Sequence, residues 1–403
     1  MKSAPCFSSQ RMKTLSSSPF AMRDDWEELD FESCLKKVNK TTKIPKKNFL
    51  VEGKYPIISQ EDEFINGFWN EEKDVFKIKK PVVIFGDHTK KIKYVDFDFV
   101  LGADGVKVLL PLDHINTRYF YYHLQALELD DLGYARHYRL LRGKKISVPP
   151  LSEQEEIVAI LDEAFAAIDR ARANIEKNIE NANELFQSRL NEIFSQKGDG
   201  WEEKKLGSLI EIKHGFAFKS EFFSDKGEFV LLTPGNFFES GGYRDRGDKQ
   251  KYYVGEIPEG FILNENDLLV AMTEQAPGLL GSPLIVPSSN RFLHNQRLGL
   301  IKTKEGINLL TEFLFYIFNT KHFRNAVYQS GTGVKVRHTS PSKIMAVKVN
   351  VNLSDCVQRD VINKLNTLSA NTNSIKIIYR AKLETLEELK KSLLQKAFSG
   401  ELT

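Results

Sequence analysis

Two kinds of side chain recur in this sequence in patterns suited to binding nucleic acid. The first kind is basic and occurs in clusters that contain no acidic residue. Six lysines lie between Lys36 and Lys47, and five cations are interleaved with aromatics between Tyr134 and Lys145. A third such segment is residues 335–338. Because cations that meet phosphates supply most of the affinity for DNA, these segments predict local DNA-binding patches.

The second and third segments share an Arg-His step, Arg136-His137 and Arg337-His338, shortly before the start of a long predicted helix in each case. The equivalent position suggests an equivalent role in binding DNA. The alternative is a solvated basic face, or ion pairs with the acidic starts of the helices.

Polar loops with forked hydrogen-bonding groups are the second kind of signal. Residues 294–297 present two amides and an arginine, the side chains that bind adenine and guanine through paired hydrogen bonds. Taken alone, each such loop is equally consistent with an ordinary surface loop. Together with the basic segments, the candidate DNA-binding residues are Ser59, Gln60, His88, Lys90, Lys91, Lys93, Tyr134, Arg136, His137, Arg139, Arg244, Arg246, Gln275, Asn295, Gln296, Arg297, Lys335, Arg337 and His338.

Motifs for catalysis are missing from the sequence. It contains neither GxxxxGK[ST] nor GxGxxG, which excludes ATP hydrolysis and dinucleotide binding by the usual devices. Pro149-Pro150 stands in a context like the Asn/Asp-Pro-Pro-aromatic motif of DNA amino-methyltransferases, but the amide or carboxylate is absent. Glu71-x-Lys73 matches only the tail of a nuclease signature, and the eight histidines lack zinc-ligand spacing. We therefore predict no catalytic residue, metal or cofactor in this chain.

Length and composition indicate folded domains with local positive charge. The 403 residues exceed one ordinary hydrophobic core, and the net charge is only +3, from 57 basic and 54 acidic residues. The three cysteines lie far apart, which fits a reducing cytosol. Since no apolar run approaches the roughly 18 residues of a membrane span, we expect a cytoplasmic protein without a membrane partner.

The first residues have a composition of their own. Residues 1–23 contain many serines and four cations but no acid, which is the composition of an organelle transit peptide. An over-extended start, with Met22 rather than Met1 as the initiator, explains it more simply. We expect residues 1–24 to form a disordered tail.

The sequence contains an internal repeat. Trp26-Glu27-Glu28 is echoed by Trp201-Glu202-Glu203, and residues 157–195 align without gaps onto residues 361–399. The parts between these motifs differ, and the second copy is longer there. The repeat therefore predicts two related domains, each followed by the same type of segment.

Apolar residues recur at steps of three and four through both aligned segments, which predicts two helices of about forty residues, or roughly 60 Å each. Ser152 and Glu155 predict a capping box at the start of the first, and Gly198 and Gly400 lie where the helices stop. Neither neighbouring domain can cover such a length, so we expect the helices to pack antiparallel on each other; packing on their own domains is the alternative. The predicted seam residues are Ile157, Leu161, Ile168, Ile175, Leu185, Leu365, Leu368, Ile375, Leu386, Leu389 and Leu393.

Short apolar runs bounded by Gly, Asp or Pro in the intervening regions predict mixed α/β domains. The expected organisation is a tail at 1–24, a first domain at 25–150, a central helix at 151–197, a second domain at 198–352 and a C-terminal helix at 353–403. The expected fold class is α+β: two pseudo-repeated mixed α/β domains separated by two long antiparallel coiled-coil helices.

In their order and duplication these features resemble the specificity subunit of type I restriction-modification enzymes. The resemblance extends from Trp26 to the C-terminus and depends on the Pro-Pro-Leu-x-Glu-Gln step at residues 149–154, the Ser330-Gly331-Thr332 turn and the ending at residues 394–402. The second helix departs from the pattern, because residues 355–358 read Asp-Cys-Val-Gln where the first has the proline step.

The resemblance implies a non-catalytic subunit of a prokaryotic complex, whose two target-recognition domains each read one half of a bipartite, asymmetric site on double-stranded DNA. It further implies that the helix pair is a spacer that docks two methyltransferase (M) subunits, which use AdoMet to methylate adenine N6. Two restriction (R) subunits, which use ATP and Mg, would cleave unmodified DNA. The alternatives are a coiled-coil protein-interaction scaffold without DNA specificity and a self-sufficient nuclease or methyltransferase.

Overall fold

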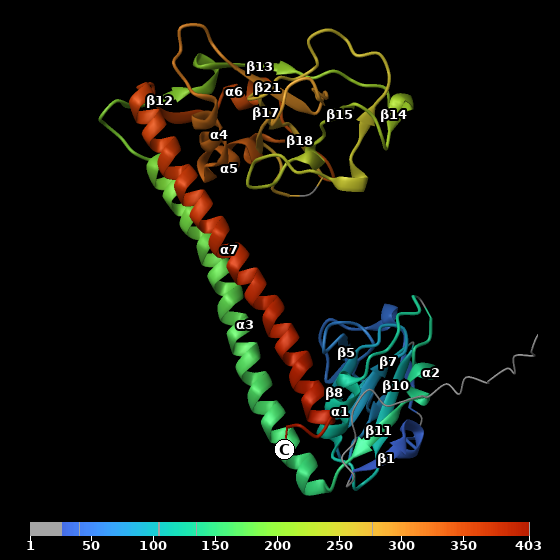
Figure 1. Cartoon of the computed structure of the whole chain (residues 1–403). Coiled ribbons are helices and arrows are strands. Elements are labelled where there is room, and N and C mark those ends of the chain that lie inside the picture. Colours follow the sequence, from blue (N-terminus) through green and yellow to red (C-terminus); the bar gives the residue numbers. More distant parts are fainter. Residues whose placement is uncertain (1–25, 40, 104, 134, 276, 403) are drawn as a thin grey trace, which may run out of the picture. The chain divides into compact units, whose positions relative to one another are not determined.

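The computed structural model describes residues 26–402 apart from residues 40, 104, 134 and 276. The expectations for the tail at residues 1–24, for the initiator at Met1 or Met22 and for Tyr134 lie outside the described residues. The chain divides into two compact units: unit 1 runs to Ile175 and resumes at Ala381, and unit 2 is Glu176–Arg380. Each unit holds one globular domain and part of two long helices, α3 (Leu151–Ile193) and α7 (Asp355–Phe398) (Figure 1).

In its described residues unit 1 contains a four-stranded sheet, a five-stranded sheet and a separate pair of strands. The first sheet is antiparallel, in the order β2 (Leu35–Lys36), β10 (Val106–Pro111), β7 (Val82–Gly86) and β8 (Ile92–Val95). The second is mixed, in the order β3 (Lys43–Ile44), β9 (Phe99–Gly102), β4 (Tyr55–Ile58) and β5 (Gly67–Trp69), with β6 (Val75–Phe76) also on β9. The first and last strands of the domain, β1 (Glu27–Asp30) and β11 (Lys145–Val148), pair with each other.

Helices close the core of unit 1. They are α1 (Thr117–Ala126), α2 (Tyr138–Arg142) and the short 3₁₀ helices η1 (Phe31–Cys34), η2 (Lys46–Asn48) and η3 (Glu72–Asp74). Asn116 caps α1 by accepting the backbone N–H groups of the first turn, which otherwise lack partners. Phe120 of α1 stacks on Phe31, and Tyr119 meets Phe398 of α7 edge to face, so the long helix belongs to the core of this unit.

Unit 2 repeats this plan. Its first sheet is antiparallel, in the order β13 (Ile210–His214), β21 (Leu298–Thr303), β17 (Leu268–Ala271) and β19 (Pro283–Ile285). Its second is in the order β14 (Phe223–Ser224), β16 (Tyr252–Tyr253), β15 (Phe229–Leu231) and β20 (Phe292–Leu293). Two further strand pairs are β12 (Trp201–Lys205) with β23 (Lys348–Asn352), and β18 (Thr273–Glu274) with β22 (Arg337–His338). The helices are α4 (Thr311–Asn319), α5 (Lys321–Ser330), α6 (Pro341–Met345), η4 (Leu206–Ser208), η5 (Ser220–Phe222), η6 (Pro234–Asn236) and η7 (Gly247–Lys249).

The two domains are related by strand order as well as by sequence. In both first sheets the chain starts at one edge, crosses to the two strands at the other side and returns in the strand between them. In both domains the opening strand pairs with the strand that leads into the long helix. The predicted α+β fold class, with two pseudo-repeated domains and two long helices, is therefore confirmed.

The long helices run antiparallel within each unit. In unit 1, Arg172 of α3 forms an ion pair with Glu387 of α7, while the earlier Phe165 of α3 lies 4.9 Å from the Nζ of the later Lys390. In unit 2, Lys376 donates to Asn183 at 3.1 Å. Neither helix contains Gly or Pro, and Gly198 and Gly400, at φ 78° and 74°, follow their ends.

The start of α3 differs from the predicted capping box. The helix begins at Leu151, one residue before Ser152, and the carbonyl of Pro150 accepts the N–H groups of Glu153 and Gln154 at 3.0 Å. Pro150 therefore caps the helix, because its carbonyl accepts these bonds while its ring disfavours a helical conformation at the preceding Pro149.

The packed faces of the helices also depart from the predicted seam. Ile157, Leu161 and Leu365 are fully buried, but Leu185, Ile375 and Leu389 are 58%, 42% and 46% exposed. A straight helix drifts about 20° per heptad against a strict seven-residue repeat, which amounts to roughly 80° over the four heptads from Ile157 to Leu185. The packed face has therefore moved to Phe186 and Leu190 at that end of α3.

Candidate nucleic-acid interface

Three loops of unit 1 meet where β7 ends. They are residues 87–91 between β7 and β8, residue 105 before β10, and residues 135–137 before α2; we call them the first loop cluster. The carbonyl of Asp87 accepts the N–H of His137 at 2.7 Å, and the carboxylate of Asp87 accepts the N–H of Tyr138 at 2.8 Å. The N–H of Asp87 donates to the carbonyl of Gly105 at 2.7 Å. One acidic residue at the end of a buried strand thus joins all three loops.

Gln60 fixes the turn of this cluster from the second sheet. Its side-chain oxygen accepts the N–H of His88 at 3.1 Å, and its carbonyl accepts the hydroxyl of Thr89 at 2.6 Å. The approach is close, since a Cβ at Gly86 would lie 2.4 Å from the Thr89 hydroxyl and 2.8 Å from the Cβ of Gln60. Gln60 and His88 are accordingly half-buried.

Several predicted DNA-binding residues of unit 1 are buried in its interior. Ser59 is 2% exposed and bonds to Asn66, and Lys93 is 6% exposed and donates to the carbonyl of Glu63 and to Asn66. Burial lowers the pKa of Lys93 to about 8. His137 is 1% exposed, and its Nδ1 lies 3.1 Å from the Asp87 carbonyl. In this structure Ser59, Lys93 and His137 hold loops in place.

The other candidates in unit 1 face solvent to different degrees. Arg136 and Arg139 are exposed. Lys90, at a positive φ of 59°, forms an ion pair with Asp131 at 3.3 Å, and Lys91 forms one with Asp62 at 2.5 Å. Exposed pairs of this kind contribute at most about 1 kcal/mol and exchange readily for other partners.

The corresponding loops of unit 2 meet in the same way at the end of β17. They are residues 272–275, 295–297 and 337–339, the second loop cluster. Thr339 donates its N–H to the carbonyl of Met272 at 2.9 Å, and Met272 donates to the carbonyl of Arg297 at 3.0 Å. The strand pair β18–β22 places Glu274 opposite Arg337. The two Arg-His steps that the sequence analysis paired therefore lie at equivalent ends of equivalent sheets.

Arg337 fastens the loop that precedes it. Its guanidinium lies 4.1 Å from the ring centre of Tyr328 and donates to the carbonyls of Tyr328 at 2.6 Å and Gly331 at 3.2 Å. Its Nε is 3.9 Å from the carboxylate of Glu274, which is 3% exposed and accepts the N–H of Leu280. Both hydrogen bonds of the guanidinium come from Nη2, so two of the five N–H donors of Arg337 are used inside the protein.

Beyond this arginine the second cluster is open to solvent. Lys335 and His338 are exposed, as are Gln275, Gln296 and Arg297, whereas Asn295 is 8% exposed and accepts the N–H of Arg297 in a tight turn. Arg244 and Arg246 belong to a separate loop that follows η6, where the N–H of Arg244 donates to the carbonyl of Asn236.

Sequence reasoning found the loops but missed what holds them. Asp87 lies directly after the buried strand β7, whereas Glu274 lies in β18, three residues after the end of β17; both are 3% exposed. An acid shortly after an apolar strand in both copies was the available signal. Within the described part of the chain, no group of three or more His, Cys, Asp or Glu could hold a metal ion. In the same residues no helix is long and apolar enough to span a membrane.

Comparison with known proteins identifies relatives of both domains. The model of a family described as the type I restriction modification DNA specificity domain matches residues 23–181 and again residues 198–351. The specificity subunit of the Escherichia coli type I restriction enzyme EcoR124I/EcoR124II is 26% identical over 348 residues, 79% of this chain and 80% of the relative. That of the enzyme MjaVIII from Methanocaldococcus jannaschii is 22% identical over 283 residues, 66% of this chain and 63% of the relative.

Solved structures share the fold. A chain from work on complex assembly and conformational transition of the type I R-M system matches with a TM-score of 0.71 at 15% identity, over 95% of this chain and all (100%) of that one. The HsdS subunit from Thermoanaerobacter tengcongensis matches with a TM-score of 0.52 at 15% identity, over 96% and 100% of the two chains.

Proposed function

Because this chain belongs to the type I restriction modification DNA specificity domain family, we propose that it is the DNA-recognition subunit of a type I restriction-modification complex. Each globular domain reads one half of a bipartite target on double-stranded DNA. The observation that supports this most strongly is the pair of loop clusters, built from the same three loops at the same end of the same sheet but with different side chains. Two domains with equivalent sheets but different loop side chains are suited to reading two different half-sites.

Within the clusters we assign different roles to exposed and buried candidates. The exposed side chains contact DNA. We assign base reading to those that end in a cation, an amide or an imidazole: Arg136, Arg139, Gln275, Gln296, Arg297, Lys335 and His338. Ser59, Lys93, His137 and Asn295 position the loops. Phosphate contacts from Lys90 and Lys91 require exchange of their carboxylate partners for DNA phosphates.

The helix pair has a separate role in this proposal: α3 and α7 set the distance between the two readers and dock two M subunits. Two weak readers joined by a stiff spacer bind together only when their half-sites lie at the matching separation. Helices of 43 and 44 residues without Gly or Pro, paired antiparallel within each unit, have the stiffness that this needs.

The reactions are assigned to the partners. M subunits transfer a methyl group from AdoMet to adenine N6, and two R subunits cleave unmodified DNA with ATP and Mg. We assign no catalytic residue to this chain, because its sequence contains neither a phosphate-loop motif nor a dinucleotide-binding motif.

An exchange of domains tests the proposal. Residues 200–352 are replaced by the same region of a relative, the chain is expressed with its methyltransferase partner, and methylated adenines are mapped across the host genome. We expect one half of the methylated motif to change while the other half and the spacing persist. An unchanged motif, or loss of one half without replacement in a folded complex, would contradict the assignment of one half-site to each domain. Failure of the chain to shift duplex DNA at any salt concentration would favour the protein-interaction scaffold instead.

A further inference from the structure

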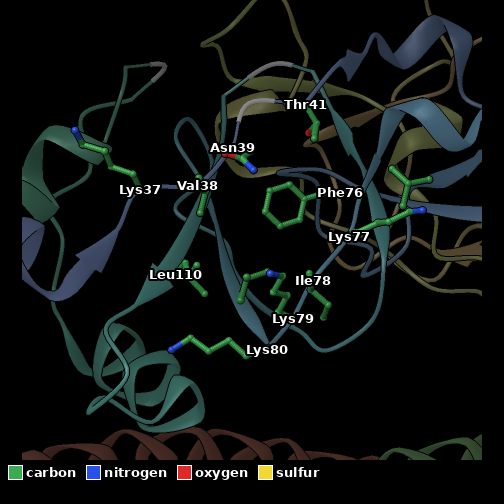
Figure 2. A pocket seen from close by; sticks show the side chains of 12 residues that line it. Lys37, Val38, Asn39, Thr41, Phe76, Lys77, Ile78, Lys79, Lys80 and Leu110 are labelled. Carbon is green, nitrogen blue, oxygen red and sulfur yellow. The ribbon is translucent and has the colours of Figure 1, made fainter.

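A groove lies on unit 1 away from the first loop cluster, formed by two segments that are distant in sequence. Residues 37–39 and Thr41 provide one wall, residues 75–80 and Val82 provide the other, and Leu110 of β10 closes the base (Figure 2). Its volume is about 410 Å³. We call it the lysine groove, because Lys37, Lys77, Lys79 and Lys80 line it and no acid is among the described residues that do.

The four lysines differ in their partners. Lys77 forms an ion pair with Glu72 at 2.8 Å, and Lys80 forms one with Asp113 at 3.3 Å. Lys37 and Lys79 are exposed, and neither forms an ion pair with any described residue. In Figure 2 the side chain of Lys37 extends away from the other labelled side chains, whereas Lys79 lies among them. The groove is therefore lined by two cations whose charge no described residue of unit 1 meets in an ion pair.

The floor of the groove is apolar but offers no anchor for a protein partner. Phe76 is 8% and Val82 1% exposed, and Ile78 is held by its N–H, which donates to Asp98 at 2.8 Å. None of the lining residues is among the large apolar side chains that the described chain exposes. Protein interfaces concentrate such side chains at their centre, whereas a sugar-phosphate backbone needs cations above a shallow, largely covered floor.

The position of the groove suits a duplex that also meets the first loop cluster. Val82, at the groove, opens β7, and Gly86, at the cluster, ends it. Four steps of about 3.3 Å separate them by roughly 13 Å, which is about four base pairs at 3.4 Å each. A DNA molecule that is read by the loops and runs along the direction of β7 would pass the groove within half a helical turn.

We propose that the lysine groove is a phosphate-binding site for the DNA that flanks the half-site read by the first domain. The inference rests on the proposed function of the chain as a DNA-recognition subunit. Lys37 and Lys79 contact the backbone directly. Lys80 shares the carboxylate of Asp113 with Lys36, so these three residues add a net positive charge, whereas the charge of Lys77 is matched by Glu72. Since phosphates are the same in every sequence, the groove adds affinity and orientation without changing the motif.

The test uses the full-length chain in complex with its methyltransferase partner and a labelled duplex that carries the mapped motif. Affinity is measured between 50 and 300 mM salt for the wild type and for Lys37→Gln, Lys79→Gln and the double variant. Each lost phosphate contact should lower the slope of log K against log salt by about 0.9, so the double variant should lose about 1.8 and bind roughly 10- to 30-fold more weakly near 0.15 M. The methylated motif should stay the same.

Two controls separate the groove from a general effect of charge. Lys73 is exposed, forms no ion pair with a described residue and does not line the groove, so Lys73→Gln should leave the slope unchanged. A duplex truncated at the outer edge of the first half-site should bind the wild type and the double variant alike, because the flanking phosphates are gone.

An unchanged slope in the double variant, or an equal fall in Lys73→Gln, overturns the proposal. The proposal is also overturned if the double variant keeps the wild-type slope but loses its methyltransferase partner during purification. That result would indicate that the groove binds an acidic protein segment rather than DNA. These outcomes leave the domain exchange unaffected, and that experiment decides the proposed function independently.

Discussion

Gln154 of α3 and Gln358 of α7 make the same hydrogen bonds in the two halves of the chain. Each glutamine is fully buried, and its side-chain oxygen accepts the N–H of the N-cap residue of a domain helix. This residue is Asn116 for α1, at 2.7 Å, and Leu310 for α4, at 2.8 Å. Each side-chain nitrogen donates to the carbonyl two residues earlier in that segment, at 3.0 and 2.9 Å. The glutamine is the part of the proline step that the second copy retains, and it joins each long helix to its domain.

This relationship predicts the effect of removing one glutamine. Gln358→Leu keeps the volume but leaves the Leu310 N–H and a carbonyl buried without partners, which should lower the free energy of unfolding of unit 2 by about 2–4 kcal/mol. Urea unfolding at pH 7 measures it. Gln395→Leu, an exposed position on the same helix, should change the free energy by less than about 0.5 kcal/mol. A loss below about 1 kcal/mol in Gln358→Leu would mean that water replaces these bonds.

Acid should destabilise unit 1 through His123. This ring is fully buried, its Nε2 accepts the N–H of Ser147 at 3.2 Å, and burial lowers its pKa from 6.5 to about 3. Because the unfolded chain takes up a proton below pH 6.5 and the folded chain does not, the stability is present above pH 6.5 and is lost as pH falls towards 3. The loss should be about 2 kcal/mol at pH 5 relative to pH 8.

The measurement compares wild type with His123→Gln, which keeps an acceptor for Ser147 but does not titrate. In a Trp201→Phe background the remaining tryptophans, Trp26 and Trp69, report on unit 1 alone. The dependence on pH should flatten in His123→Gln and persist in His114→Gln, an exposed position of the same unit. Equal slopes in all three proteins would refute the assignment to His123.

Arg337 should act in recognition mainly by shaping its loop. Arg337→Lys keeps the charge but loses the forked bonds to the carbonyls of Tyr328 and Gly331, so the loop should open more easily by about 2 kcal/mol, more than tenfold in hydrogen exchange. The variant should methylate its target more weakly, or should accept more sequences, and any change of accepted sequence should be confined to the half-site of the second domain. Full activity and unchanged exchange in Arg337→Lys would show instead that charge alone matters.

The proposed spacer role predicts a change in target geometry. Seven helix-forming residues are inserted into each of α3 and α7, at facing positions, which lengthens the pair by about 10 Å. The spacing between the two methylated half-sites should rise by about three base pairs, while the half-sites themselves stay the same. Genome-wide mapping of methylated adenines gives the result, and an unchanged spacing in an active complex would exclude the spacer role.

The sequence was sufficient for features that depend on pattern along the chain. Repetition of Trp26 at Trp201 and of residues 157–195 at 361–399 predicted two related domains and two long helices, which the structure contains. It was insufficient where helices had to be placed in three dimensions. Leu185 fits a heptad but is exposed, because the rotation that accumulates along a helix is invisible in a residue count.

The candidate site shows the same division. The loops and the shared Arg-His steps follow from sequence alone, because basic and polar residues between apolar strands are local features. Contacts between distant segments decide which side chains face solvent. Asp87 bonds to the buried His137, Glu274 and Tyr328 contact Arg337, and residues 37–39 meet residues 75–80 in the lysine groove. Local pattern thus determined the kind of protein and the segments that serve it. Only tertiary structure decided which of their side chains are free to meet DNA, because burial and pairing depend on neighbours that the order of residues does not specify.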